Sequence, residues 1–168
     1  MNITNIEFKA SVNDLAAAET KLQTLSPIYK GLDHQVDTYF NVPHGRLKLR
    51  EGNIEHALIQ YHRDNLAGAK KSSVVLYKHK PDPALKQILT LQFGIWKVVD
   101  KQRKIYFIDH VKFHFDQVLG LGEFMEVEVI NENNRFTTAE LQDECNRWVN
   151  FFQIQPDQFL VSSYSDMV

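Results

Sequence analysis

Two short segments near opposite ends of the chain carry carboxylates that could hold a metal ion. Ile6-Glu7-Phe8-Lys9 alternates apolar and charged residues, and so does Phe124-Met125-Glu126-Val127-Glu128-Val129. Successive side chains of a β-strand point to opposite faces, so Glu7 shares a face with Lys9, and Glu126 shares one with Glu128. Magnesium and manganese prefer oxygen ligands and commonly use one or two carboxylates together with substrate phosphates.

Cationic side chains recur at every second position in further segments that have the character of strands. Arg46, Lys48 and Arg50 share a face, with Leu47 and Leu49 on the other. The same spacing joins Tyr61 to Arg63, Lys101 to Arg103, and Lys112 to His114 and Asp116. Arg and Lys bind anionic phosphate oxygens, and phosphoryl or nucleotidyl transfer is catalysed mainly by positioning and charge neutralisation. A channel with these cations and an acidic end would bind a polyphosphate and a metal ion.

A simpler alternative stays open, because many antiparallel sheets keep one face in water and alternate charged with apolar residues for that reason alone. The charged faces could point into a lumen or outward to solvent. The residues opposite the charges are mostly large and apolar, so they need a cover, which the predicted helices can supply. His114 also has two interpretations, as a metal ligand or as a hydrogen-bonding residue of the sheet. The second is favoured, because the histidines lack zinc-motif spacing.

The composition is that of a globular protein and excludes several classes. The chain has 168 residues, of which 43% are hydrophobic, and this suits a single domain over residues 1–168. The net charge of −2 argues against a general nucleic-acid binder. The one cysteine, Cys145, excludes an intrachain disulfide and is expected in the core. No apolar run approaches the ~20 residues of a membrane span, so we expect a cytoplasmic protein without a membrane partner.

The chain reads as many consecutive strands with few helices. We expect strands at 2–10, 35–41, 46–51, 56–64, 73–80, 95–108 with a break near Asp100, 111–118 and 123–132. The loop 64–72 is expected to be polar. We expect helices at 12–25, capped by Ser11 or Asn13, at 82–94 with Leu85, Ile88 and Leu89 inward, and after the Thr137–Glu140 capping box. The last of these carries Leu141, Cys145, Trp148, Val149 and Phe152 on one face. So many strands in succession predict an α+β fold with a barrel-like antiparallel sheet and helices packed outside.

Several segments in order along the chain resemble the CYTH superfamily, the triphosphate tunnel metalloenzymes, and within it the class IV adenylyl cyclase-like (CyaB-like) branch. The matching segments are Asn5–Ala10, Asp37–Glu51, Ala69–Ser72, Lys101–Arg103, Lys112–Asp116, Leu121–Glu128 and Ser163–Asp166. The resemblance implies an eight-stranded antiparallel β-barrel, a tunnel that binds a triphosphate and a divalent cation, Mg²⁺ or Mn²⁺.

The resemblance also implies roles for individual residues. The metal ligands would be Glu7, Asp116, Glu126 and Glu128. The phosphates would be held by Lys9, Lys48, Arg50, Arg63, Lys70, Lys101, Arg103 and Lys112. Family members convert ATP to cyclic AMP and pyrophosphate, or hydrolyse thiamine triphosphate or inorganic tripolyphosphate. A cyclase, a phosphohydrolase and a non-catalytic nucleotide- or polyphosphate-binding module all remain open, and so do the catalytic base and the oligomeric state.

Two positions depart from the family pattern. The family signature at the amino terminus is Glu-x-Glu-x-Lys, and here Asn5 stands in place of the first Glu. An amide oxygen can still bind a metal, but it brings no charge. Lys112 stands where related chains often carry Arg, which removes a bidentate contact to phosphate.

Overall fold

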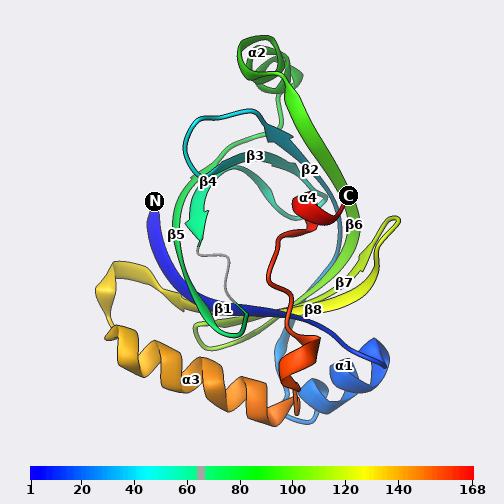
Figure 1. Cartoon of the computed structure of the whole chain (residues 1–168), viewed down its shortest axis with the longest axis vertical. Helices are drawn as coiled ribbons and strands as arrows, with labels where there is room; N and C mark the ends of the chain where they lie inside the picture. The colour runs from blue at the N-terminus through cyan, green and yellow to red at the C-terminus, as the bar shows by residue number, and fades with distance from the viewer. Residues whose placement is uncertain (64–66) are drawn as a thin grey trace.

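Eight antiparallel strands close into a barrel in the computed structural model of the chain, which describes residues 1–63 and 67–168 (Figure 1). The strands are β1 (Asn2–Ser11), β2 (Ile28–Phe40), β3 (Arg46–Glu51), β4 (His56–Arg63), β5 (Lys70–Lys78), β6 (Ile95–Ile108), β7 (Val111–Val118) and β8 (Gly122–Asn131). Around the barrel they follow the order β1-β5-β4-β3-β2-β6-β7-β8, and β8 pairs with β1. Closure leaves no free sheet edge. The α+β barrel predicted from the sequence is confirmed.

The charged faces of the strands point into the barrel. In the pairing of β1 with β8, Glu7 lies opposite Glu128 and Lys9 lies opposite Glu126, and all four side chains line an internal cavity. Because side chains alternate along a strand, Phe8 and Val127 point outward and are buried beneath the helices. The sequence left the direction of the charged faces open, and the structure places them inside.

The apolar outer face of the barrel is covered by α1 (Leu15–Gln23) and α3 (Thr138–Phe151), which Figure 1 shows on one side of the barrel. Leu22, Leu141 and Cys145 from these helices join Phe8 and Phe113 in the largest core cluster. The Thr137–Glu140 capping box starts α3 as predicted. Its predicted apolar face is also confirmed, since Trp148, Val149 and Phe152 pack partly buried against the same cluster.

The helix α2 (Pro83–Phe93) covers another part of the wall. It begins at the predicted Asp82 cap, and Leu85 and Leu89 pack with Leu49. The prediction that Ile88 points inward is wrong, because its side chain is 57% exposed. Leu85 and Leu89 are four residues apart and therefore share one narrow face of the helix. Ile88 lies at the edge of that face and is left exposed.

Several predicted boundaries shift in the structure. The cap of α1 is Asp14 rather than Ser11 or Asn13, because the Asp14 carboxylate accepts the backbone N–H of Ala17 at 2.8 Å. β2 begins at Ile28, β5 begins at Lys70, and β6 runs unbroken through Asp100. Part of the predicted loop 64–72 is therefore strand. Its residues 64–66, and with them the predicted end of the strand at 64, lie outside the described residues.

The C-terminal segment returns to the barrel after α3. It passes through a 3₁₀ turn, η2 (Pro156–Gln158), and ends in the short helix α4 (Tyr164–Met167); another 3₁₀ turn, η1 (Glu132–Asn134), follows β8. The backbone N–H of Leu160 donates to the carbonyl of Lys9 at 2.9 Å, and α4 lies within the outline of the barrel in Figure 1. Among the described residues, no helix has both the length and the hydropathy that a membrane span requires.

Candidate functional site

The interior of the barrel holds a cavity of about 530 Å³. Inward-facing residues from all eight strands line it, because each strand contributes every second side chain. The predicted site residues that line it are Glu7, Lys9, Lys48, Arg50, Arg63, Lys101, Arg103, Lys112, Glu126 and Glu128. Lys70 and Asp116 are buried close by but are not part of its lining.

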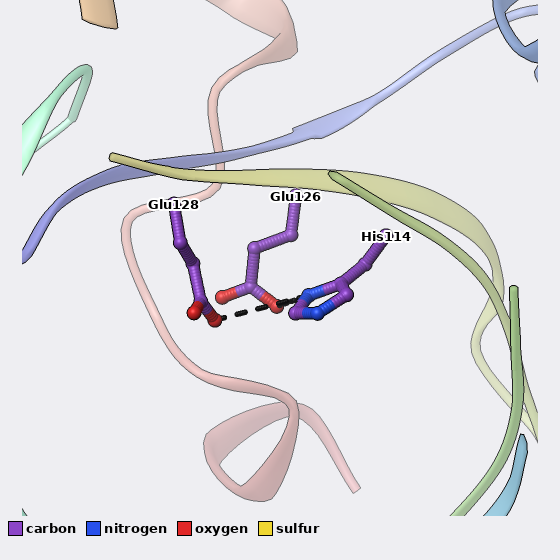
Figure 2. A group of neighbouring side chains, drawn as sticks. All are labelled: His114, Glu126 and Glu128. Atoms are coloured by element: carbon purple, nitrogen blue, oxygen red, sulfur yellow. Dashed lines mark hydrogen bonds and ion pairs between the residues drawn. The ribbon is translucent and has the colours of Figure 1, made fainter. Parts of the chain in front are cut away.

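An acidic cluster lies on one wall of the cavity, on β7 and β8. Figure 2 shows Glu126, Glu128 and His114 pointing toward one another. His114 Nδ1 lies 3.4 Å from Glu126 Oε2 and 3.8 Å from Glu128 Oε1, and one potential ligand atom from each residue falls within 4.8 Å of the others. The sequence interpretation did not place His114 in this cluster, although its alternation with Lys112 and Asp116 put it on the correct face.

The two carboxylates of the cluster differ in their surroundings. Glu126 lies 2.9 Å from Arg103 Nη2 and 3.5 Å from Lys9 Nζ. Burial alone would raise the pKa of Glu126, but Lys9, His114 and Arg103 hold that pKa well below its usual value. Glu128 makes no ion pair with a Lys or Arg of the described chain, and burial together with the Glu126 charge raises its pKa to about 7. Glu128 is therefore a partly buried carboxylate without a Lys or Arg ion-pair partner in the described chain.

The donor set of this wall fits a hard divalent cation. Glu7 is the cross-strand neighbour of Glu128 on β1, so three carboxylates from adjacent strands lie on one wall. The Asn5 Oδ1 atom is buried without a hydrogen-bond partner among the described residues, and Asn5 lines the same cavity. Carboxylate and amide oxygens are the ligands that Mg²⁺ and Mn²⁺ accept. A bound cation would also compensate the charge of Glu128.

Asp116 is not among the potential metal ligands that lie together in the His114, Glu126 and Glu128 group. Its two oxygens accept from Arg103, from Nε at 2.6 Å and from Nη2 at 2.5 Å, and the Tyr164 hydroxyl donates to Oδ2 at 2.8 Å. The same Arg103 Nη2 contacts Glu126. Such a bidentate pair fixes the plane of a guanidinium. Asp116 thus orients Arg103 toward the cavity.

On another part of the wall, three cations converge on Asp37, a residue of β2 to which the sequence analysis gave no role. Its carboxylate lies 3.0 Å from Lys48 Nζ, 2.9 Å from both Nε and Nη2 of Arg50, and 2.8 Å from Lys101 Nζ. Burial would raise the pKa of Asp37, but Arg50, Lys101 and Lys48 hold it well below the usual value. The sequence did contain a signal for an inward-facing Asp37. It is two residues from Tyr39 and so shares its face of the strand, and Tyr39 also lines the cavity.

Another carboxylate, Glu55, enters from the loop between β3 and β4. It pairs with Lys112 and lies 2.9 Å from Arg50 Nη1. Arg63 pairs in turn with Glu7 at 2.9 Å. No alternation marks Glu55 in the sequence, because loop residues follow no period. The predicted phosphate-binding cations that line the cavity are therefore all held by carboxylates, as buried charges require.

Lys70 contacts the C-terminal segment. Its ammonium donates to the carbonyls of Val161 at 2.8 Å and Leu160 at 3.3 Å, and so ties the C-terminal segment to β5. Nearby, the Lys9 ammonium lies 3.7 Å from the centroid of the Tyr164 ring. These contacts hold Tyr164 at the end of the cavity where β1 finishes.

Sequence and structure comparisons agree with this architecture. The family model described as "CYTH domain" matches residues 4–146. No curated protein matches the chain in sequence. A solved protein of Pyrococcus horikoshii OT3 superposes with a TM-score of 0.78 at 22% identity, over 98% of this chain and 99% of that one.

Two further solved structures carry functional descriptions. A candidate adenylate cyclase of Vibrio parahaemolyticus superposes with a TM-score of 0.75 at 16% identity, over 97% of this chain and 96% of that one. A candidate adenylyl cyclase of Hippeastrum, described as having a dominant triphosphatase activity, superposes with a TM-score of 0.58 at 14% identity, over 97% and 91%. At these identities the likeness concerns the fold.

Proposed function

The chain belongs to the CYTH domain family, and we propose that it is a metal-dependent enzyme that cleaves a triphosphate substrate inside the barrel. One observation carries the proposal: a carboxylate cluster in which Glu128 has no Lys or Arg ion-pair partner among the described residues faces the same cavity as a set of buried Lys and Arg side chains. A metal ion and a polyanion bound together would satisfy both groups. The first candidate reaction is that of a class IV adenylyl cyclase, which converts ATP to cyclic AMP and pyrophosphate.

The metal ligands in this proposal are Glu126 and Glu128, with Glu7 on the adjacent strand and the amide oxygen of Asn5. All are oxygen donors that line the cavity, which favours Mg²⁺ or Mn²⁺ over softer metals. The bound metal would withdraw negative charge from the phosphate oxygens that it contacts. Asp116 is assigned to orienting Arg103 instead of binding metal, because both of its oxygens are already engaged.

The phosphate oxygens would be bound by the cations that now pair with lumen carboxylates. Lys48, Arg50 and Lys101 are held together by Asp37, so they present a fixed positive wall before any ligand arrives. Lys9, Arg63, Arg103 and Lys112 add further positive charge to the lining. Preorganised charges of this kind stabilise a transition state with little reorganisation. Lys70 is assigned to holding the C-terminal segment.

Cyclisation and hydrolysis place the same demands on these residues and differ in the nucleophile. In the cyclase the ribose 3′-hydroxyl attacks the α-phosphorus, and pyrophosphate leaves. In a triphosphatase, water attacks the terminal phosphorus, the diphosphate is the leaving group, and the transferred phosphoryl group becomes orthophosphate. The similarity to the Vibrio structure supports the first reaction, and the triphosphatase activity of the Hippeastrum structure favours the second, on thiamine triphosphate or inorganic tripolyphosphate.

Product analysis tests the proposal directly. The purified chain is incubated separately with ATP, thiamine triphosphate and tripolyphosphate, with magnesium or manganese, and with EDTA as the control. Cyclic AMP and pyrophosphate from ATP support the cyclase; orthophosphate without cyclic AMP supports the triphosphatase. Binding with no product in any mixture would contradict an enzymatic role and leave a binding module, an outcome that the uncharged Asn5 would favour.

A further inference from the structure

The loop between β3 and β4 is built around a buried carboxylate. Asp33, on β2, is fully buried. Its Oδ1 accepts the backbone N–H of Asn53 at 2.5 Å and of Ile54 at 2.8 Å, and its Oδ2 accepts that of Glu55 at 3.1 Å. Successive backbone N–H groups in a turn form a concave site for an anion. Gly52 permits the close approach, because a Cβ there would lie 2.6 Å from Asp33 Oδ1. Asp33 therefore sets the conformation of this loop.

The loop places the Glu55 side chain inside the barrel. Its Oε2 lies 2.9 Å from Arg50 Nη1 and accepts from Gln35 Nε2 at 3.1 Å, and its Oε1 pairs with Lys112. Gln35 Nε2 also donates to Asp33 at 2.7 Å, so it connects the two carboxylates. Burial would raise the pKa of Glu55, but Lys112 and Arg50 hold that pKa well below its usual value. Glu55 is therefore charged at neutral pH and neutralises two cations that line the cavity.

Glu55 differs from the other counter-ions of the lumen in exposure and in attachment. Its side chain is 26% exposed, against 1% for Asp37 and 0% for Asp116. Asp37 and Asp116 lie within β2 and β7, whereas Glu55 lies in a loop. A partly exposed loop side chain can leave its partners without breaking a strand pair. Of these three carboxylates, Glu55 is the one that an incoming anion can displace.

We infer that Glu55 is an internal competitor for the triphosphate, a tethered anion that occupies Arg50 and Lys112 until phosphate oxygens displace it. Asp33 is the positioning residue that holds it there. The inference rests on the proposed function, because it assumes that phosphates bind among the lumen cations. Two negative groups compete for the same two cations, so Glu55 raises the dissociation constant of the triphosphate. Weaker binding of the ground state also keeps the site from retaining an anionic product.

Glu55→Gln tests the competition, because it keeps the size of the side chain and removes its charge. The probe is imidotriphosphate, whose bridging N–H groups resist hydrolysis, titrated by calorimetry into the intact chain with magnesium. The dissociation constant should be about tenfold lower in the variant than in the parent protein. The variant should also unfold at a lower urea concentration, because Lys112 loses its carboxylate. Structural damage would lower stability and affinity together, so changes in opposite directions identify competition.

Glu51→Gln is the matched control, because it removes the same charge close by. The Glu51 carboxylate pairs with Lys86 of α2 at 2.7 Å, and neither residue lines the cavity. This variant should leave the dissociation constant within about twofold of the parent value. Metal binding cannot imitate the expected gain. Lys112 lies opposite Glu128 on β8, so a released Lys112 would compete with the metal ion and weaken binding.

Asp33→Asn tests the positioning role. An amide turns one of its two acceptor oxygens into a donor, so the loop loses hydrogen bonds and Glu55 is held less firmly on its cations. The dissociation constant of imidotriphosphate should fall about threefold, and adding Asp33→Asn to Glu55→Gln should give no further gain. That lack of additivity shows that Asp33 acts through Glu55. If Asp33→Asn fails to fold, Glu55→Gln still decides the competition.

The outcomes separate this inference from the proposed function. If the parent chain binds imidotriphosphate and Glu55→Gln leaves the dissociation constant unchanged or raises it, the inference is overturned while the triphosphate site stands. An equal gain for Glu51→Gln would overturn it too, because the effect would then come from net charge. If neither the parent nor the Glu55 variant binds the probe, the proposed function fails and the inference fails with it.

Discussion

Asp37 and Glu128 are both carboxylates on inward-facing strand positions, yet their surroundings are opposite. Asp37 is enclosed by Lys48, Arg50 and Lys101, and its pKa is held well below the usual range. Glu128 has no Lys or Arg partner in the described chain, and its pKa is raised to about 7. The comparison teaches that an inward-facing place on a strand does not distinguish a counter-ion from a ligand. The local balance of charge does.

Removing the Asp37 charge should produce the largest effect. Asp37→Asn keeps the shape of the side chain but leaves the buried Arg50 and Lys101 and the partly buried Lys48 without their shared carboxylate. Breaking a buried ion pair in this way costs about 3–5 kcal/mol. Urea unfolding should show this loss of free energy. The control is Asp100→Asn, since Asp100 pairs with His34 in an exposed position and an exposed pair contributes at most about 1 kcal/mol. Equal losses of free energy in the two variants would contradict the role of Asp37 as the shared counter-ion of three cations.

Asp116→Asn tests whether Asp116 is a counter-ion, as Asp37 is, or a metal ligand, as we propose for Glu128. As an orienting partner of Arg103 it should behave like Asp37, with a smaller loss of about 1–3 kcal/mol because Arg103 keeps Glu126. Triphosphate binding should weaken, while the magnesium concentration for half-maximal activity stays unchanged. A marked rise in that magnesium requirement would instead return Asp116 to the metal ligands.

Glu128→Gln should raise the free energy of unfolding, whereas Asp37→Asn and Asp116→Asn lower it. A carboxyl whose pKa is raised from about 4.3 to about 7 lowers the free energy of unfolding as the pH rises through that window, since the unfolded chain ionises first. In EDTA at pH 8 the Gln variant should therefore be more stable than the parent protein by about 1–3 kcal/mol, and the difference should vanish near pH 4. Melting temperatures across this pH range provide the measurement.

The same variant should lose metal affinity. Without the Glu128 carboxylate, magnesium should bind about tenfold more weakly, as titration calorimetry would show. Glu123→Gln is the control, because Glu123 lies on the same strand and is exposed. A Gln variant that is less stable than the parent in EDTA would show that Glu128 has a counter-ion after all.

Most of the correct predictions from the sequence came from the alternation of charged and apolar residues along the strands. A period of two put Glu7, Lys9, Glu126 and Glu128 on common faces, and the number of strands predicted a barrel with helices outside. The pattern could not say which face pointed inward, because both a wet outer face and a charged lumen produce it. Closure into a barrel decides that question through strand pairing over the whole chain, which no local pattern records.

The partners inside the lumen were harder to predict. Glu55 comes from a loop and follows no period, and the bidentate contact between Arg103 and Asp116 depends on β6 pairing with β7. Lys70 lies on an inward-facing position, yet it bonds carbonyls at Leu160 and Val161, ninety and ninety-one residues away. Long-range contacts of this kind are set by the fold, not by neighbouring residues in sequence.

Asn5→Glu should have the smallest effect on stability, and it tests whether Asn5 belongs to the metal site together with Glu128. Asn5 lies beside Ile130 on β8, and its Oδ1 has no hydrogen-bond partner in the described chain. The position therefore accommodates an oxygen atom that is free to bind a metal ion. A carboxylate there adds another negative charge beside Glu7 and Glu128. We expect a small loss of stability in EDTA, on the order of 1 kcal/mol, and magnesium affinity a few-fold higher than in the parent protein.

Asn5→Asp is the matched control for that experiment, because it adds the same charge on a shorter side chain that keeps the length of Asn5. If both variants bind magnesium more tightly, the added charge decides the affinity. If only Asn5→Glu does, the reach of the oxygen decides it. Unchanged affinity in both would separate Asn5 from the metal and leave Glu7, Glu126 and Glu128 as the ligands. The contrast with Asp37 would then rest on Glu128 and its two carboxylate neighbours alone.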